Sequence, residues 1–167
     1  MSAVPPSSRP SSFDWPWFHS QLVVEHSLIE AILSRALAPS AGIGERANVV
    51  DGGWRSGESI AYWPEAAHTL EALRECLATK GLRAWAVVHR GDGSYHNWHR
   101  HDGTHWRCSG VLYLTNGGAR TLFRHDGKIL RSAPALGRVI TFPSKIEHAT
   151  ERHYGPPRIT VAFNVAP

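Results

Sequence analysis

Two stretches in the first half of the chain have the spacing of apolar residues that is typical of amphipathic helices. From Gln21 to Ala38, apolar side chains recur every three or four residues, and Pro39 ends the pattern. A second stretch runs from Pro64, a residue suited to a first helical turn, to Lys80, with Gly81 just beyond it. This periodicity puts the apolar side chains on one face of each helix. We predict two helices that pack against the protein core.

After Gly81 the pattern changes to short runs rich in β-branched and aromatic residues, which favour strands. Turn-forming residues separate them, and Asn116-Gly117-Gly118 and Asp126-Gly127 favour hairpins. Helices followed by many short strands indicate a mainly β fold, a helix-supported β-sandwich or jelly roll, and not a parallel α/β sheet. The predicted strands are Ala84–His89, Ser109–Thr115, Ala119–Arg124, Arg138–Phe142 and Arg158–Val165.

The length and composition fit one folded domain. The chain has 167 residues, of which 42% are hydrophobic, enough for one core. Residues 1–12 are rich in Ser and Pro and are expected to form a disordered tail. We therefore expect a single domain over residues 13–167, as a monomer or a homodimer.

Charge and cysteine content exclude several classes of protein. The net charge is +4, but the arginines are scattered and form no basic stripe, so no nucleic-acid partner is expected. Cys76 and Cys108 are too few and too far apart for a disulfide framework or a zinc motif, which favours a reducing compartment. Neither a membrane span nor a signal peptide is indicated. We expect a cytoplasmic protein.

The segment Tyr95–His105 contains four histidines and one aspartate. In an extended strand, residues i and i+2 share a face, so His99 and His101 are expected to point together. Asp102 needs a bend to join them, which Gly103 permits. Imidazoles, with or without a carboxylate, suit iron(II), zinc or copper. The alternative is a group of solvated loop histidines.

A second group of polar residues lies near the C-terminus. A predicted strand ends in a turn that carries His148, and the next strand presents Arg158 and Thr160 on one face. A guanidinium beside a hydroxyl suits the far carboxylate of a bound dicarboxylate. We expect neighbouring strands to deliver this imidazole and guanidinium to one cavity, closed from the opposite side by Asn97–Asp102. The alternative for Arg158 is a surface arginine that begins a strand.

In order and spacing these residues resemble the double-stranded β-helix oxygenases that use iron(II) and 2-oxoglutarate, and among them a small subgroup of uncharacterised bacterial, phage and marine proteins. The resemblance covers roughly residues 50 to 165. It rests on Gly53-Trp-Arg-Ser56, Ala84-Trp85, Asn97-Trp-His-Arg-His101, Ser109-Gly-Val-Leu-Tyr-Leu114, Phe142-Pro143, His148 and Arg158-Ile-Thr-Val-Ala-Phe-Asn164.

The resemblance implies a cupin-like double-stranded β-helix and a role for each matched residue. His148 matches the distal iron ligand, Arg158 the arginine that holds 2-oxoglutarate, and Thr160 its hydroxyl partner. Tyr113 falls where such enzymes often place a residue that contacts the co-substrate. The implied cofactors are Fe(II), 2-oxoglutarate as co-substrate, and O2.

The chain departs from the family at the proximal motif. The family has His-x-Asp or His-x-Glu, whereas this chain has His99-Arg-His101-Asp102. Either His101 replaces the carboxylate, or a bulge brings Asp102 to the metal. We favour a catalytic metal site of His99, His101 and His148, with Asp102 as the alternate ligand.

The resemblance implies a dioxygenase that hydroxylates or otherwise oxidises a small molecule or peptide and releases succinate and CO2. Two other functions stay open. One is a three-His, cupin-type iron enzyme, a dioxygenase or isomerase, that does not use 2-oxoglutarate. The other is a non-catalytic β-barrel that binds a small ligand.

Overall fold

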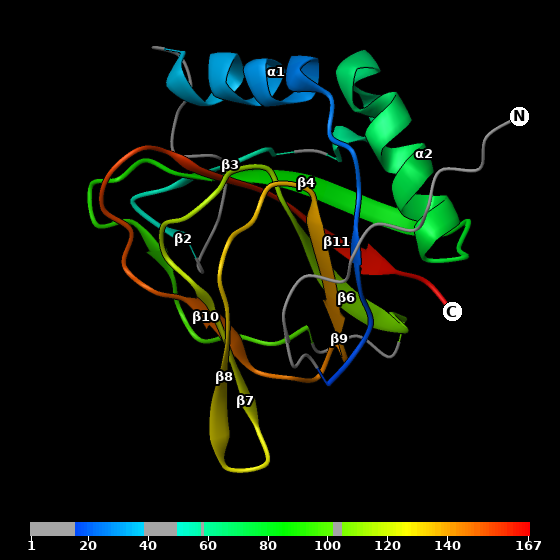
Figure 1. Cartoon of the computed structure of the whole chain (residues 1–167), viewed down its shortest axis with the longest axis vertical. Helices are drawn as coiled ribbons and strands as arrows, with labels where there is room; N and C mark the ends of the chain where they lie inside the picture. The colour runs from blue at the N-terminus through cyan, green and yellow to red at the C-terminus, as the bar shows by residue number, and fades with distance from the viewer. Residues whose placement is uncertain (1–15, 39–49, 58, 102–104) are drawn as a thin grey trace, which may run out of the picture.

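The computed structural model describes residues 16–38, 50–57, 59–101 and 105–167. Two β-sheets face each other, and two helices cover the outer side of the larger one (Figure 1). The helices are α1 (His26–Leu37) and α2 (Ala67–Cys76), with 3-10 turns η1 (Ile60–Tyr62) and η2 (Pro64–Ala66). The strands are β1 (His19–Gln21), β2 (Val50–Asp51), β3 (Trp54–Arg55), β4 (Leu82–His89), β5 (Tyr95–His96), β6 (Cys108–Tyr113), β7 (Thr121–His125), β8 (Lys128–Ser132), β9 (Arg138–Phe142), β10 (His148–Thr150) and β11 (Arg158–Val165).

The strand pairing is antiparallel and follows the jelly-roll pattern. The larger sheet has the order β1-β9-β6-β11-β4-β3, and a smaller sheet has the order β10-β7-β8. A further pair, β2 and β5, forms its own ladder. Because strands adjacent in the larger sheet are distant in sequence, the chain crosses repeatedly between sheets. The prediction of a mainly β, double-stranded β-helix with supporting N-terminal helices is confirmed.

Side-chain alternation along β11 separates the core from the site. Successive side chains of a strand point to opposite faces. One face packs into the apolar cluster shared with α1 and α2, through Ile159, Val161, Phe163 and Val165. The other face lines a cavity between the sheets, through Arg158, Thr160 and Ala162. The two-residue period of this strand therefore places Arg158 inside the protein.

The two predicted helices are present but shorter than their apolar patterns. The first begins at His26 rather than Gln21, because Gln21 pairs with Arg138 in the strand ladder and Leu22 N–H donates to the Gly137 carbonyl at 2.8 Å. The second has a 3-10 turn at Pro64, and its α-helix ends at Cys76 rather than Lys80. Both helices bury leucine and isoleucine side chains against the larger sheet, among them Leu28, Ile32, Leu70 and Leu73.

The five predicted strands are present: β9 and β11 have the predicted bounds, and the ends of β4, β6 and β7 differ by at most two residues. The hairpin at Asp126-Gly127 joins β7 to β8, and both turn residues have positive φ, +47° and +72°. A glycine tolerates that backbone conformation without cost. β8 itself lacks a clear β-type pattern and was not predicted.

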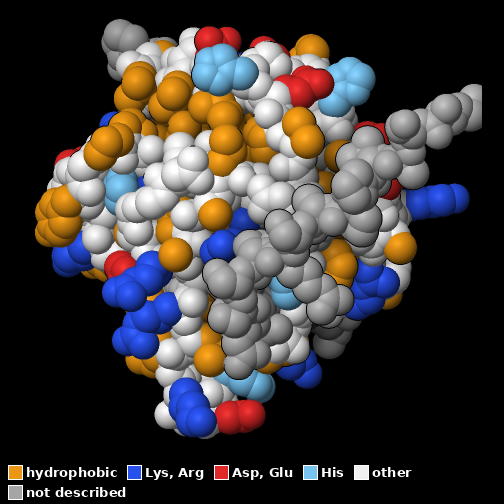
Figure 2. Space-filling view, viewed as in Figure 1, with side chains coloured by type: hydrophobic (Ala, Val, Ile, Leu, Met, Phe, Trp, Pro, Cys, Tyr) orange, Lys and Arg blue, Asp and Glu red, His pale blue; other side chains and the backbone are white. Residues whose placement is uncertain are grey.

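The charge distribution agrees with the scattered arginines of the sequence. Lys and Arg side chains are spread over the face shown in Figure 2, and hydrophobic side chains gather near α1.

Within the described ranges, no helix is long and apolar enough to cross a membrane. The predicted tail, residues 1–12, lies outside those ranges.

Candidate metal and co-substrate site

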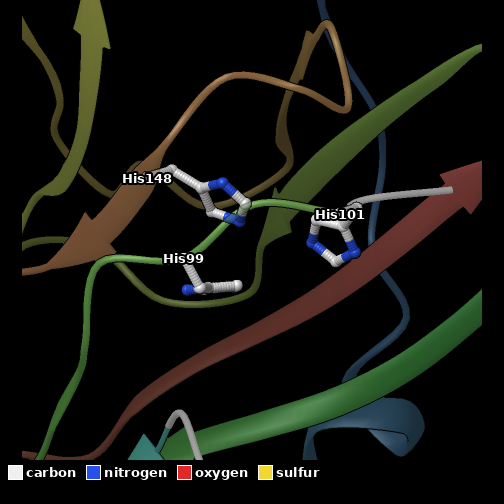
Figure 3. A group of neighbouring side chains, drawn as sticks. All are labelled: His99, His101 and His148. Carbon is white, nitrogen blue, oxygen red and sulfur yellow. The ribbon is translucent and has the colours of Figure 1, made fainter.

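Three of the predicted histidines converge at one end of the cavity. His99, His101 and His148 each offer a ring nitrogen, and these three atoms lie within 4.8 Å of one another. The ring centroids of His99 and His148 are 4.1 Å apart, and those of His101 and His148 are 5.2 Å apart. Figure 3 shows His148 at the start of β10 and the other two rings on the neighbouring segment. Such a set of imidazoles can hold a divalent transition metal.

Main-chain hydrogen bonds bring these histidines together. His99 N–H donates to the His148 carbonyl at 3.0 Å, and His148 N–H donates back at 2.8 Å. His101 N–H donates to the Ser144 carbonyl at 3.0 Å. The segment 97–101 is therefore paired at one bridge, at His99, and forms no regular strand. The expected i, i+2 arrangement of His99 and His101 arises from this pairing.

The structure corrects the predicted arrangement of the C-terminal strands. His148 was expected on the strand next to that of Arg158, but it begins β10 in the smaller sheet, whereas Arg158 begins β11 in the larger one. The segment 97–101 was expected opposite His148 and instead pairs with it. The turn after β9 carries the chain across to the other sheet, so the imidazole and the guanidinium line the same cavity from facing sheets.

Backbone carbonyls fix the proton positions of two of the histidines. Nδ1 of His99 is 2.8 Å from the Asn97 carbonyl, and Nδ1 of His148 is 3.0 Å from the Ile146 carbonyl. A carbonyl accepts only, so each Nδ1 must carry the proton and donate it. Nε2 is then left with a free lone pair. This is how a second hydrogen bond orients a metal-binding imidazole.

His101 is oriented by a side chain instead. Its Nδ1 lies 3.5 Å from Nδ2 of Asn164, and its ring centroid lies 6.1 Å from that of Trp85. Asn164 in turn accepts a hydrogen bond from Ser109 at 2.7 Å through its amide oxygen. The direction of the Asn164 amide therefore governs which nitrogen of His101 carries the proton. Asp102, the alternate ligand, lies outside the described residues.

Burial keeps the imidazoles of His99 and His148 neutral. Burial, and then the proximity of His99, lowers the pKa of His148 from 6.5 to about 3. Burial also lowers the pKa of His99, against the opposing effect of its hydrogen bond to Asn97. A neutral imidazole is the form that binds a metal. These two side chains can therefore bind a metal at neutral pH without first releasing protons.

Arg158 is a buried cation on the facing sheet. Its side chain is only 2% exposed. Nε donates to the Ala119 carbonyl at 2.9 Å, Nη1 to Nδ1 of His89 at 3.2 Å, and Nη2 to Oγ1 of Thr121 at 2.9 Å. A guanidinium has five N–H groups, so two remain for another acceptor.

The cation has no acidic partner within the part of the chain that the structure describes. The ion pairs there involve other basic residues, and burial lowers the pKa of Arg158. An unpaired buried charge is costly, and natural proteins generally pair it. The surroundings of Arg158 are therefore suited to an anionic ligand in the cavity.

Thr160 and Tyr113 are cross-strand neighbours beside this guanidinium. Thr160 lines the cavity two residues along β11. Tyr113 is fully buried beneath Arg158, whose Cζ lies 5.5 Å from the ring centroid, and its hydroxyl is 2.8 Å from Oγ1 of Thr121. Tyr113 thus contacts the residues that hold Arg158 and is not among those that line the cavity.

Three further polar residues of the site were missed in the sequence: His89, His96 and Thr121. His89 pairs directly with Arg158 across the β4–β11 ladder. In the sequence, His89 is marked only as a polar residue directly after the apolar residues 84–88. His96 and Thr121 line the cavity from β5 and β7. Their involvement follows from the pairing of strands and not from any local motif.

The cavity between the sheets has a volume of about 50 Å³. His148 lines it from the smaller sheet and Arg158 from the larger one, with His99 and His101 beside His148. The apolar part of the lining includes Val87, Val111, Phe142 and Ala162. A cavity that combines apolar lining with convergent polar groups is typical of a small-molecule site.

The comparisons with known proteins bear on the fold. No protein-family model and no curated protein matches the sequence. Among solved structures, a prolyl-4-hydroxylase from Pseudomonas putida has a TM-score of 0.66 at 16% identity, over 89% of this chain and 91% of that one. A prolyl hydroxylase from Trichoplax adhaerens, in complex with a hypoxia inducible factor oxygen degradation domain peptide fragment, has a TM-score of 0.66 at 13% identity, over 84% and 76%.

A third structure is an oxidoreductase of the 2OG-Fe(II) oxygenase family from Burkholderia pseudomallei. Its TM-score is 0.58 at 16% identity, over 84% of this chain and 78% of that one. Identities this low establish architecture and not activity. The chain has the double-stranded β-helix fold of the 2-oxoglutarate- and iron(II)-dependent oxygenases.

Proposed function

We propose that this protein is an Fe(II)- and 2-oxoglutarate-dependent dioxygenase that hydroxylates or otherwise oxidises a small molecule or a peptide. One observation carries the proposal. A buried guanidinium without a described acidic partner and three convergent imidazoles line the same cavity from facing sheets. A dicarboxylate that binds a metal at one end and a cation at the other requires this combination.

The donor set fits the proposed cofactors. His99, His101 and His148 would hold Fe(II) through neutral imidazole nitrogens, which suit that ion. Arg158 would hold the far carboxylate of 2-oxoglutarate with its two remaining N–H groups, and Thr160 would add a hydroxyl. Bound iron and 2-oxoglutarate would supply the oxidising chemistry, with O2 as the oxidant and with succinate and CO2 as the products of the co-substrate.

The protein contributes orientation and exclusion of water. Thr121 and the Ala119 carbonyl hold Arg158 in one orientation, and Tyr113 supports it from below. The apolar side chains in the lining would limit the water around a bound ligand and so strengthen the attraction between the guanidinium and a carboxylate. The substrate class is less constrained. A peptide is one candidate, because the Trichoplax enzyme of the same fold was solved with a peptide.

The test removes the proposed co-substrate anchor. Arg158→Ala should weaken the binding of 2-oxoglutarate about 100-fold, because a charged hydrogen-bonded partner in a buried site is lost. Calorimetry on the metal-loaded protein without oxygen measures this, and metal analysis should show unchanged iron content.

Two controls accompany this experiment. Arg158→Lys keeps the charge without the planar fork and should fall between wild type and Arg158→Ala. Arg120→Ala removes an exposed arginine that pairs with Glu151 and should leave affinity unchanged. Equal affinities in wild type and Arg158→Ala would remove the basis of the proposal.

A second candidate is a three-His, cupin-type iron enzyme that does not use 2-oxoglutarate. It is favoured by the three imidazoles themselves, because the metal-binding group found within the described residues contains no carboxylate. Incubation with Fe(II), O2 and 2-oxoglutarate separates the two candidates. Release of succinate supports the proposed dioxygenase, and oxygen uptake without succinate supports the alternative.

A further inference from the structure

Two histidines that are not in the metal group form a hydrogen-bonded chain behind it. His89 lies at the end of β4 and His96 at the end of β5. Nδ1 of His89 is 3.2 Å from Nη1 of Arg158, and Nε2 of His89 is 3.2 Å from Nδ1 of His96. The chain therefore runs from Arg158 through His89 to His96.

The guanidinium fixes the donor and the acceptor in each of these hydrogen bonds. Arginine has donors only, so Nδ1 of His89 must accept from Arg158. His89 then carries its proton on Nε2 and donates it to Nδ1 of His96. His96 in turn carries its proton on Nε2. Each ring thus has a single tautomer that is set by the fixed donor at the start of the chain.

The surroundings favour neutral rings, which this chain needs. Burial, and then the charge of Arg158, lowers the pKa of His89 to about 2. Burial and His89 lower the pKa of His96 well below its usual value. A protonated His89 would place two donors against each other at Arg158.

His96, the last member of this hydrogen-bonded series, borders the cavity. His96 is among the lining residues, and its Nε2 has no partner within the described part of the chain. Its ring centroid lies 5.1 Å from that of His89 and 5.7 Å from that of His99. The His96 ring thus lies between His89, which contacts Arg158, and His99, and it borders the cavity.

We propose that His96 is a co-substrate-binding residue whose Nε2–H donates to an oxygen of bound 2-oxoglutarate, and that His89 is a positioning residue that links it to Arg158. This inference rests on the proposed function. It makes the co-substrate subsite a connected unit, in which the arginine that binds one end of the ligand also sets the tautomer of a second donor. The donor would favour an anionic or carbonyl oxygen and disfavour an N–H group at that position.

The tautomers can be read in the metal-free protein. Long-range proton–nitrogen correlation spectra of protein labelled with nitrogen-15 in histidine distinguish an Nε2–H ring from an Nδ1–H ring. We expect Nε2–H for both His89 and His96. His89→Asn can keep an acceptor near the position of Nδ1 for Arg158, but its shorter side chain has no donor at the position of Nε2, so the His96 ring should become a mixture of tautomers. An Nδ1–H tautomer of His96 in the wild-type protein would overturn the proposal.

Binding measurements test the donor itself. His96→Leu should weaken 2-oxoglutarate binding about 10-fold, as expected for loss of one hydrogen bond to a charged ligand. His96→Gln supplies an amide N–H in a similar place and should recover most of this loss. His68→Leu, a change at an exposed position of α2, should have no effect.

The outcomes distinguish the two proposals. If wild type binds 2-oxoglutarate and Arg158→Ala does not, but His96→Leu binds as wild type does, the inference about His96 is wrong and the proposed function stands. If wild type does not bind 2-oxoglutarate, the proposed function fails, and the tautomer spectra still decide whether the directed chain exists.

Discussion

At the scale of single residues, hydrogen bonds outside the cavity determine which nitrogen of each histidine carries the proton and which is free to bind a metal. Main-chain carbonyls hold the proton of His99 and of His148 on Nδ1. The lone pairs on Nε2 are thereby available without competition from water. The Nδ1 of His101 lies instead beside the Asn164 side-chain amide, at 3.5 Å. Its tautomer is therefore linked to a side chain rather than to a main-chain carbonyl.

Substitutions can test whether His101 or Asp102 is the third metal ligand. We expect His101→Ala to lower the iron content of the purified protein strongly, as His148→Ala should, because either change removes one of three donors. Asp102→Ala should retain iron if the three histidines form the site. Metal analysis after reconstitution with one equivalent of Fe(II) measures this. Loss of iron in Asp102→Ala with retention in His101→Ala would identify Asp102 as the ligand.

The buried histidines also predict how stability depends on pH in the metal-free protein. The pKa of His89 is about 2 in the folded state, against about 6.5 for the free side chain. Below pH 6.5 the unfolded chain therefore binds a proton that the folded protein does not. The free energy of unfolding should then fall by about 1.4 kcal/mol per pH unit for this group as the pH is lowered toward 2.

Urea denaturation at pH 7.5 and 5.5 checks this prediction. His89→Asn should show a shallower loss of stability between these two pH values than wild type. Val88→Ala, which destabilises the same strand without removing a titratable group, should keep the wild-type dependence. An unchanged pH dependence in His89→Asn would contradict the prediction.

At the scale of elements, strand packing leaves little room beside the cavity. Gly110 in β6 lies against the Phe163 ring and the Ile140 carbonyl, and an added Cβ would approach that carbonyl to 2.6 Å. Neither neighbour can withdraw easily, since Ile140 is in the adjacent strand β9 and Phe163 is fully buried in β11. Glycine at this position allows the strands to pack tightly.

Gly110→Ala should therefore destabilise the protein. We expect the free energy of unfolding to fall by about 1 to 3 kcal/mol, as for other overpacked cores. Gly57→Ala is a suitable control because nothing lies within 4 Å of the added Cβ, and its effect should be within about 0.5 kcal/mol. Equal stability of the two variants in urea denaturation would show that β6 can move to make room.

At the scale of the whole molecule, the metal site joins parts of the chain that are far apart in sequence. His99 and His101 follow β5, and His148 begins β10 on the edge of the smaller sheet. These segments approach only in the folded protein. A metal bound by all three imidazoles therefore stabilises the folded state and not the unfolded chain.

This coupling predicts a metal-dependent melting temperature. At a free Fe(II) or Ni(II) concentration 100 times the dissociation constant, the melting temperature should rise by about 5 to 10 °C for a domain of this size. A chelator should reverse the rise, and His148→Ala should not show it. Thermal unfolding under anaerobic conditions measures all three cases. An equal rise in His148→Ala would place metal binding elsewhere.

Much of the architecture was predictable because it depends on local periodicity. The three- to four-residue spacing identified both helices, and the two-residue spacing placed Arg158 and Thr160 on one face of a strand that is buried on both sides. The ends of the helices were less predictable. The pairing of Gln21 with β9 overrides the helical pattern, since a backbone group in a ladder cannot also serve a helix.

The sequence by itself determined the residue types of the candidate site and the period that points them inward. Only the tertiary structure decided that His148 and Arg158 lie on facing sheets, that His99 pairs with His148, and that hydrogen bonds link Arg158 to His89 and His89 to His96. The physical reason is that strand pairing between distant segments depends on the whole core. A local pattern fixes which face a side chain occupies and not which strand lies opposite.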